Sequence, residues 1–175
     1  MEFEKLTKER QSIRSYAEKS VPAELIEKVL RTAQAAPSWK NSQTARCYVV
    51  TSGKYAEIRH EILPEGNAKK AKNAVLIITA FVKDTAGFTD GKPDNDGGNF
   101  WGAYDLGLHD ALLVLAAKDN GLDTLIMGLR NADKIREILE IPENEQIMSV
   151  IALGYRDENP PARPRKPLEE VIVYK

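Results

Sequence analysis

Hydrophobic residues along the chain follow two patterns, a helical repeat and short continuous runs. A repeat every three to four residues, the spacing of one helix face, predicts helices over residues 2–10, from Pro22 to residue 35 or 36, 55–63, about 103–120, and after the capping residue Asn131. Continuous apolar runs predict strands over residues 46–51, 74–82, 123–129 and 147–153. The run at 74–82 is rich in β-branched residues, which is typical of a buried central strand. The chain is therefore expected to form a single domain, residues 1–175.

The breaks between these elements carry signals of their own. Pro64-Glu65-Gly66-Asn67 predicts a break after the third helix, and Gly121 suits the left-handed position that ends the long helix. Residues 84–99 are rich in glycine and aspartate, which indicates a lid, a binding loop or a partly disordered segment. A rigid Pro-rich arm at 160–167 leads to a last apolar strand at 171–173. Such an arm either carries that strand onto a partner subunit, as in a domain-swapped dimer, or lets it pack back on its own sheet.

Composition narrows the class of protein. The sequence has 175 residues and a formal net charge of −1, so no overall field attracts nucleic acid or an acidic lipid surface. Cys47 is the only cysteine, which excludes an intrachain disulfide and fits a reducing compartment. The charged first residues lack the apolar stretch of a secretory signal, and the longest apolar run is too short to span a membrane. These features predict a cytoplasmic protein with neither nucleic acid nor a membrane as partner.

Familiar catalytic motifs are absent from the sequence. The two histidines, His60 and His109, lie on different predicted helices without the spacing of a zinc site, so no metal is expected. His109-Asp110 is expected to be a surface pair, because adjacent helical residues do not face each other. Carboxylates are expected on solvated faces, and no nucleophile elbow, Walker loop or dinucleotide-binding glycine motif occurs. Either a bound cofactor performs the chemistry, or the protein only binds a ligand.

Two clusters of basic residues are candidates for an anion site. Arg10 and Arg14 flank Ser12 within one short segment, and Arg163 and Arg165 lie between prolines near the other end of the chain. Arginine suits phosphate because its planar group donates two parallel hydrogen bonds and keeps its charge. Each cluster by itself is also compatible with a solvated basic surface.

Five motifs, in order along nearly the whole chain, resemble the FMN-dependent nitroreductase family. They are Arg10-Gln11-Ser12-Ile13-Arg14; Ala36-Pro37-Ser38-Trp39-Lys40-Asn41-Ser42-Gln43; Gly66-Asn67 followed by Lys69 and Lys70; Asp105-x-Gly107 continuing through Leu112-Leu113 to the segment 121–128; and Arg163-Pro164-Arg165-Lys166-Pro167. Each motif is weak by itself, whereas five in register are specific.

The resemblance implies an α+β fold, with a central mixed or antiparallel sheet flanked by helices, in an intertwined homodimer whose C-terminal strand is swapped. It also implies FMN at the dimer interface, NAD(P)H as co-substrate, and a nitro compound, quinone or similar small molecule as electron acceptor. In this ping-pong chemistry NAD(P)H passes a hydride to flavin N5 and leaves before the acceptor enters. The flavin does the chemistry, so no side chain is expected to be catalytic.

The resemblance also assigns the cofactor site residue by residue. Expected at the phosphate and ribityl chain are Arg10, Gln11, Ser12, Arg14, Arg163 and Arg165. Expected at the flavin ring are Asn67, Lys70, Ile126, Met127 and Gly128, and, from the other subunit, Pro37, Ser38, Trp39 and Asn41. Three aromatic residues either cover the flavin face and shape the acceptor pocket, or are ordinary core aromatics at a helix start: Phe100, Trp101 and Tyr104.

The sequence departs from the family pattern in several places. Thr44 and Ala45 replace the usual proline and a common aromatic, Gln11 replaces a frequent basic residue, and Met127 stands where some members carry a carboxylate. Little chain lies between residues 85 and 100 to build a large lid, which disfavours reductive dehalogenation or flavin destruction, because those relatives usually carry lid insertions. The main alternative to an enzyme is an FMN-binding module that stores or senses flavin.

Overall fold

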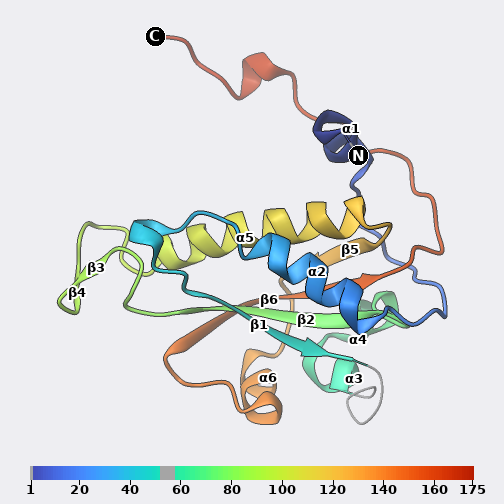
Figure 1. Cartoon of the computed structure of the whole chain (residues 1–175), viewed down its shortest axis with the longest axis horizontal. Helices are drawn as coiled ribbons and strands as arrows, with labels where there is room; N and C mark the ends of the chain where they lie inside the picture. Colours follow the sequence, from blue (N-terminus) through green and yellow to red (C-terminus); the bar gives the residue numbers. More distant parts are fainter. Residues whose placement is uncertain (1, 52–57) are drawn as a thin grey trace.

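Four strands form one antiparallel sheet at the centre of the molecule (Figure 1). In this computed structural model, which describes residues 2–51 and 58–175, the strand order is β1-β2-β6-β5. The strands are β1 (Ala45–Val50), β2 (Val75–Val82), β5 (Asp123–Met127) and β6 (Glu145–Gly154). β2 pairs along its length with β6, where Ile77 lies opposite Ile151. The sheet is thus antiparallel rather than mixed, and the apolar run at 74–82 is the interior strand that its pattern predicts.

Helices cover both faces of this sheet (Figure 1). One face packs against α2 (Ala23–Ala33) and α5 (Phe100–Asp119), and the other against α3 (Ile58–Ile62), α4 (Glu65–Lys70) and α6 (Ala132–Leu139). Side chains alternate along β2, so Ile77 joins the core under α2 and α5 while Ile78 joins the opposite core. Both isoleucines are fully buried. This cover on two faces explains why the strand is a nearly continuous apolar run.

Helix boundaries follow several of the capping signals. α1 spans Phe3–Glu9, and the side-chain oxygen of Asn131 accepts the Lys134 N–H at 3.1 Å at the start of α6. Gly121 has φ +75° shortly after α5 ends, which confirms the left-handed residue predicted there. α2 ends at Ala33, slightly before the predicted stop. Within the described ranges, no helix is both long enough and apolar enough to cross a membrane.

The break predicted at residues 64–67 is present, because α3 ends at Ile62, but a new helix, α4, begins directly after it. Pro64 has φ −56° and ψ 148° and occupies the capping position before Glu65. Proline suits the start of a helix, and Glu65 adds a negative charge to the first turn. The helix predicted over 55–63 overlaps α3, while residues 55–57 lie outside the described part of the chain.

The segment 84–99 folds against the first turn of α5 rather than forming partly disordered chain. It contains a short hairpin, β3 (Phe88–Thr89) and β4 (Lys92–Pro93). Trp101 Nε1 donates to Asn95 Oδ1 at 2.9 Å, which ties the segment to the helix. Gly87 has φ +79°, and a Cβ at this position would lie 2.7 Å from the Trp101 ring. A glycine is therefore needed for the segment to close on this tryptophan.

The C-terminal arm leaves the sheet and does not return to it (Figure 1). It runs past α1 and includes one 3₁₀ turn, Leu168–Glu170. Residues 171–173 form no strand, and Val171 and Val173 are 62% and 77% exposed. The alternative in which this segment packs back on its own sheet is therefore wrong, and the swapped arrangement stays a prediction.

Candidate functional site

An extended N-terminal segment runs beside the start of β5. The Ile13 N–H donates to the Thr124 carbonyl at 3.0 Å, and Ser12 forms a parallel bridge to Thr124. Ile13 is fully buried in the core. Because side chains alternate along an extended chain, Arg10, Ser12 and Arg14 share the face opposite Ile13. The burial of one isoleucine thus turns three polar side chains outward together.

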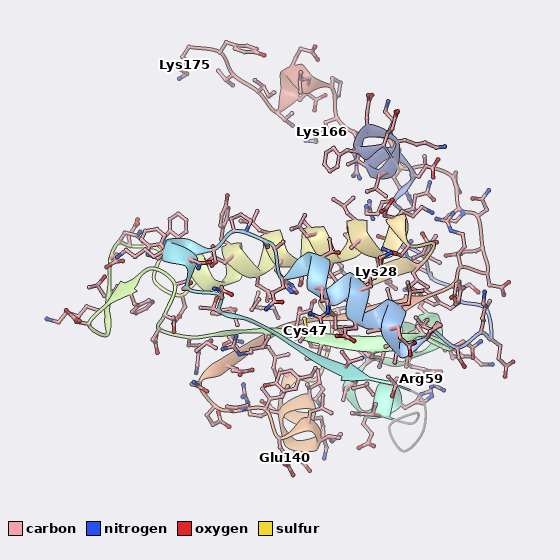
Figure 2. The ribbon with its side chains drawn as sticks, viewed as in Figure 1. Lys28, Cys47, Arg59, Glu140, Lys166 and Lys175 are labelled. Atoms are coloured by element: carbon pink, nitrogen blue, oxygen red, sulfur yellow. The ribbon has the colours of Figure 1, made fainter. Side chains whose placement is uncertain are left out.

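These side chains and the C-terminal arm form one cavity of about 700 Å³, here named the basic cavity. Its lining consists of Thr7, Lys8, Arg10, Gln11, Ser12 and Arg14 on one side, and of Pro160, Pro161, Ala162, Arg163 and Arg165 on the other. The structure thereby brings together the two arginine clusters from opposite ends of the sequence. The arm continues through Lys166 to Lys175, which lies far from the sheet in Figure 2.

The lining of the basic cavity has five basic side chains and no carboxylate. Within the described residues, the side chains of Arg10, Arg163 and Arg165 make no ion pair, so their charges are not compensated there. Arg14 Nη1 donates to the Ser12 carbonyl at 3.0 Å, which leaves other N–H groups of this guanidinium for a ligand. Two carboxylates lie beside this lining, since the Arg14 backbone N–H donates to Glu158 and Lys8 pairs with Glu4, but the cavity wall itself is basic although the formal net charge of the chain is −1. Such a set of donors favours a phosphate.

A second group of predicted residues meets at the end of β5. Asn67 on α4 donates from Nδ2 to the Leu129 carbonyl at 3.2 Å, so it lies beside the segment that follows β5. The Met127 side chain is buried in the core, whereas Gly128 is exposed. The backbone at 127–128 is therefore what this segment offers to a ligand. The remaining predicted residues of this group are exposed, namely Lys70 and Ile126.

The predicted loop after α2 meets the predicted pocket aromatics within one chain. The ring centroids of Trp39 and Trp101 are 4.6 Å apart, and those of Trp101 and Tyr104 are 5.7 Å apart. Phe100 and Tyr104 are 78% and 60% exposed, so the alternative that they are core aromatics is wrong. Together with residues 95–97, the aromatics at the start of α5 line an open cavity of about 380 Å³. This surface is suited to a flat apolar molecule.

The loop between α2 and β1 has a strained backbone. Lys40, Asn41 and Gln43 have φ values of 47°, 55° and 49°. This left-handed region costs roughly 1–2 kcal/mol for most L-residues, such as Lys40 and Gln43, and less for asparagine. The Gln43 N–H donates to Ser38 Oγ at 3.0 Å, and the Lys40 ammonium lies 3.3 Å from the Asp94 carboxylate. Strain of this kind is concentrated in loops that bind ligands.

A chain of polar side chains lies between α5 and the sheet. His109 Nδ1 is 3.1 Å from Asp110 Oδ1, and Thr79 Oγ1 donates to Asp110 Oδ2 at 3.1 Å. The Thr79 and Ser149 hydroxyls are 2.9 Å apart, and the Cys47 thiol (Figure 2) lies 4.0 Å from His109 Nε2. The surface pair predicted for His109-Asp110 is wrong, because both residues are buried. Since α5 is enclosed by α2 and the sheet, two neighbouring helix positions both face protein.

This polar chain is not a nucleophilic triad. Burial, together with the nearby Asp110 carboxylate, raises the pKa of the Cys47 thiol to about 12. The thiol is therefore protonated at neutral pH, whereas a nucleophilic cysteine must be a thiolate. The contacts among Cys47, His109 and Asp110 therefore give buried polar groups their partners and do not provide a reactive thiolate.

The two sets of predicted cofactor residues lie near opposite ends of α5 within one chain (Figure 1). The Trp39 N–H is bound to Asp105 near the start of this helix. The segment 10–14 lies beside Thr124, just beyond the end of the helix. From Asp105 to the last residue of α5, a helix rises about 21 Å. One chain therefore does not bring the loop after α2 to the basic cavity.

Comparison with known proteins identifies the family. The sequence profile of the Nitroreductase family matches residues 7–155, most of the chain apart from the C-terminal arm. A relative from Methanothermobacter thermautotrophicus, whose name places it with NADH dehydrogenase/NAD(P)H nitroreductase, is 31% identical over 89% of this chain and 78% of its own. An iodotyrosine deiodinase from Nematostella vectensis is 26% identical over 99% of this chain and 75% of its own. The crystal structure of an oxidoreductase containing FMN has a TM-score of 0.83 at 27% identity and covers 96% of this chain and 89% of its own. The chain belongs to the nitroreductase family of oxidoreductase enzymes.

Proposed function

We propose that this enzyme binds FMN and uses it to pass a hydride from NAD(P)H to a nitro compound, a quinone or a similar small acceptor. The observation that carries the proposal is the basic cavity, which unites Arg10 and Arg14 with Arg163 and Arg165. A phosphate monoester matches these donors in charge and geometry. The choice of a flavin is supported by the family and by the FMN-containing structure at 27% identity.

The residues around the basic cavity fit the phosphate and ribityl chain of FMN. The arginines and the Ser12 hydroxyl supply hydrogen-bond donors for phosphate oxygens. The Oε1 atom of Gln11 is buried without a hydrogen-bond partner among the described residues, and a ribityl hydroxyl would donate to it. Asn67 and the backbone at 127–128 would hold the edge of the flavin ring. Their N–H groups would stabilise negative charge on that edge.

Bound FMN would supply hydride acceptance and release, which is chemistry that amino-acid side chains do not provide. The protein contributes binding, orientation and exclusion of water. Phe100, Trp101 and Tyr104 would shape the acceptor pocket, because an electron acceptor of this class has a flat ring that packs on aromatic side chains. No side-chain acid is required for this role.

A homodimer would complete the flavin site. Because the loop Pro37–Asn41 lies about 21 Å along α5 from the arginines, the loop that meets a given flavin comes from a second copy of the chain. The C-terminal arm would hold the two copies together. Its exposed hydrophobic residues include Leu168, Val171, Val173 and Tyr174, and an apolar surface of this kind marks a contact with a partner. Residues 171–173 would pair with a sheet edge of the partner.

An anaerobic absorbance measurement tests the proposed reaction. FMN-loaded protein is expected to lose its yellow colour on addition of NADH or NADPH and to regain it with a quinone or a nitroaromatic compound. Protein that binds FMN but is never bleached by either nucleotide would contradict turnover. That result would support the alternative of an FMN-binding module that stores or senses flavin.

Reductive dehalogenation is the second candidate reaction, and the deiodinase relative is the observation that favours it. The segment 84–99 forms only a two-residue hairpin ladder here, which leaves little chain to enclose a halogenated amino acid. Reductive dehalogenation is therefore less favoured than reduction of a nitro compound or a quinone. The two candidate reactions are separated by adding either iodotyrosine or a nitroaromatic compound to the reduced enzyme. The compound that reoxidises the flavin identifies the reaction.

A further inference from the structure

Asp105 lies near the start of α5 and faces the loop that carries the predicted flavin-ring residues. Its Oδ2 accepts the Trp39 N–H at 2.8 Å, and the residue is only 5% exposed. Trp39 directly follows Ser38 and lies two positions before Asn41. The bond therefore holds the middle of the stretch that is expected to contact the flavin of a second subunit.

Asp105 differs from the other buried aspartates in its partners. Asp110 contacts both His109 and Thr79, and Asp123 forms ion pairs with two basic side chains. Among the described residues, Asp105 has one hydrogen bond and no ion pair. Burying a carboxylate is costly unless it is well partnered. Here the charge is directed at a single backbone N–H group of the loop.

The loop has few other anchors on its inner side. A cavity of about 230 Å³ lies there, with Ser38, Thr44 and Asp105 in its lining. Buried hydroxyls in this region, on Ser42 and Thr44, have no hydrogen-bond partner among the described residues, so they do not hold the loop. On the outer side, the Lys40 side chain reaches Asp94 and Thr89 but is 65% exposed, and exposed ion pairs of this kind are weak. The Trp39 ring packs against Trp101 at a centroid distance of 4.6 Å, which holds a side chain of the loop, whereas Asp105 holds the loop backbone.

We propose that Asp105 is a positioning residue for flavin binding, which acts through the Trp39 backbone by holding the loop Pro37–Asn41 in its binding shape. This inference rests on the proposed function. A charged acceptor makes a stronger hydrogen bond than a neutral one, and this strength holds the loop against the strain of its left-handed residues. A loop that is already in its bound shape loses less entropy on binding, so the flavin is held more tightly.

Two substitutions separate the hydrogen bond from the charge. Asp105→Ala removes the acceptor and is expected to weaken FMN binding roughly ten- to a hundredfold, the effect of losing one charged hydrogen bond. Asp105→Asn keeps an oxygen acceptor at the same place but removes the charge, so it is expected to restore only part of that affinity. The dissociation constant is measured by FMN titration of flavin-free protein. Asp110→Ala is the matched control, because it removes a buried carboxylate of α5 that has no bond to the loop. It is expected to lower the melting temperature and leave the FMN affinity unchanged.

A second readout needs no flavin. In flavin-free protein, the backbone amide proton of Trp39 is expected to shift upfield and to exchange faster in Asp105→Ala than in unaltered protein. If Asp105→Ala does not fold, Asp105→Glu takes its place, because it keeps the charge but displaces the carboxylate, and the same loss of affinity is expected.

Two results would overturn the positioning role. One is a folded Asp105→Ala protein that binds FMN as tightly as the unaltered protein. The other is an equal loss of affinity in Asp110→Ala. Unaltered protein that binds no FMN would instead overturn the proposed function, and the Trp39 amide measurement would still report on the loop.

Discussion

Arg156 and Asp123 form a two-pronged ion pair at the base of the C-terminal arm. Arg156 Nε donates to Asp123 Oδ2 at 2.7 Å, and its Nη2 donates to Oδ1 at 2.6 Å. Asp123 is the first residue of β5, and Arg156 lies two residues beyond the end of β6. The pair therefore fixes the place where the arm leaves the sheet. Since the arm forms one wall of the basic cavity, the pair also sets the position of that wall.

Breaking this ion pair is expected to lower both stability and FMN affinity. Asp123→Asn leaves the Arg156 and Lys118 charges without their carboxylate, and we expect the free energy of unfolding in urea to fall by about 3 kcal/mol. Glu27→Gln is the control, because it breaks an exposed pair with Arg31 on α2 and is expected to cost about 0.5 kcal/mol or less. Equal effects of the two substitutions would show that the pair at the base of the arm has no special role.

Removing single arginines tests the basic cavity. Arg14→Ala and Arg165→Ala are each expected to weaken FMN binding by ~1.5–3 kcal/mol, because each loses a charged hydrogen bond to phosphate. Lys28→Ala removes one positive charge from α2, outside the cavity lining, and is expected to leave the affinity unchanged. Fluorescence titration of FMN measures all three. The proposed site would have to be abandoned if both arginine variants bound FMN normally.

Changes in the C-terminal arm test the swapped dimer. Deletion of residues 160–175 is expected to give a monomer that has lost its flavin, because the arm is proposed to make the dimer contact and carries Arg163 and Arg165. Val171→Asp is a milder variant that places a charge in the apolar stretch and leaves the arginines in place. Sedimentation velocity is expected to show a shift toward monomer in both cases. A flavin-loaded monomer after the deletion would refute the swap.

The pKa of Cys47 predicts how the protein responds to alkali. The folded thiol keeps its proton up to about pH 12, while an unperturbed thiol releases it near pH 9.0. The unfolded state is therefore favoured increasingly as pH rises through this window, and the effect is absent below pH 9.0. Cys47→Ala is expected to flatten the loss of stability in that range. Because Cys47 is the only cysteine, iodoacetamide should label the native protein slowly at neutral pH, and rapid labelling would contradict the assigned pKa.

Local signals in the sequence predicted those parts of the fold that depend on local physics. Asn131 caps α6 and Gly121 follows α5, because capping needs only a side-chain oxygen or a residue that tolerates positive φ. The interior strand was predictable because its apolar run leaves no solvated face. The start of α4 was not, because Pro64 has the same sequence signal in a turn and at a helix start.

The sequence predicted which residues belong to the candidate site better than it predicted how the fold brings them together. Motif order assigned the arginines to one ligand, but only the folded chain shows that the arm closes the same cavity. Asp105 and the buried pair His109-Asp110 could not be recognised as buried polar groups from helical spacing. Their burial depends on how α2 and the loop after it cover α5, which is a tertiary contact between segments far apart in the sequence.

The affinity of the protein for FMN compared with riboflavin tests the central claim most directly. The two flavins share the ring and the ribityl chain, and only FMN carries the phosphate that the basic cavity is proposed to hold. Because riboflavin lacks the phosphate and so makes none of its charged hydrogen bonds, it is expected to bind at least roughly a hundredfold more weakly than FMN in the same titration. Equal affinities for the two flavins would contradict the assignment of the basic cavity to the FMN phosphate.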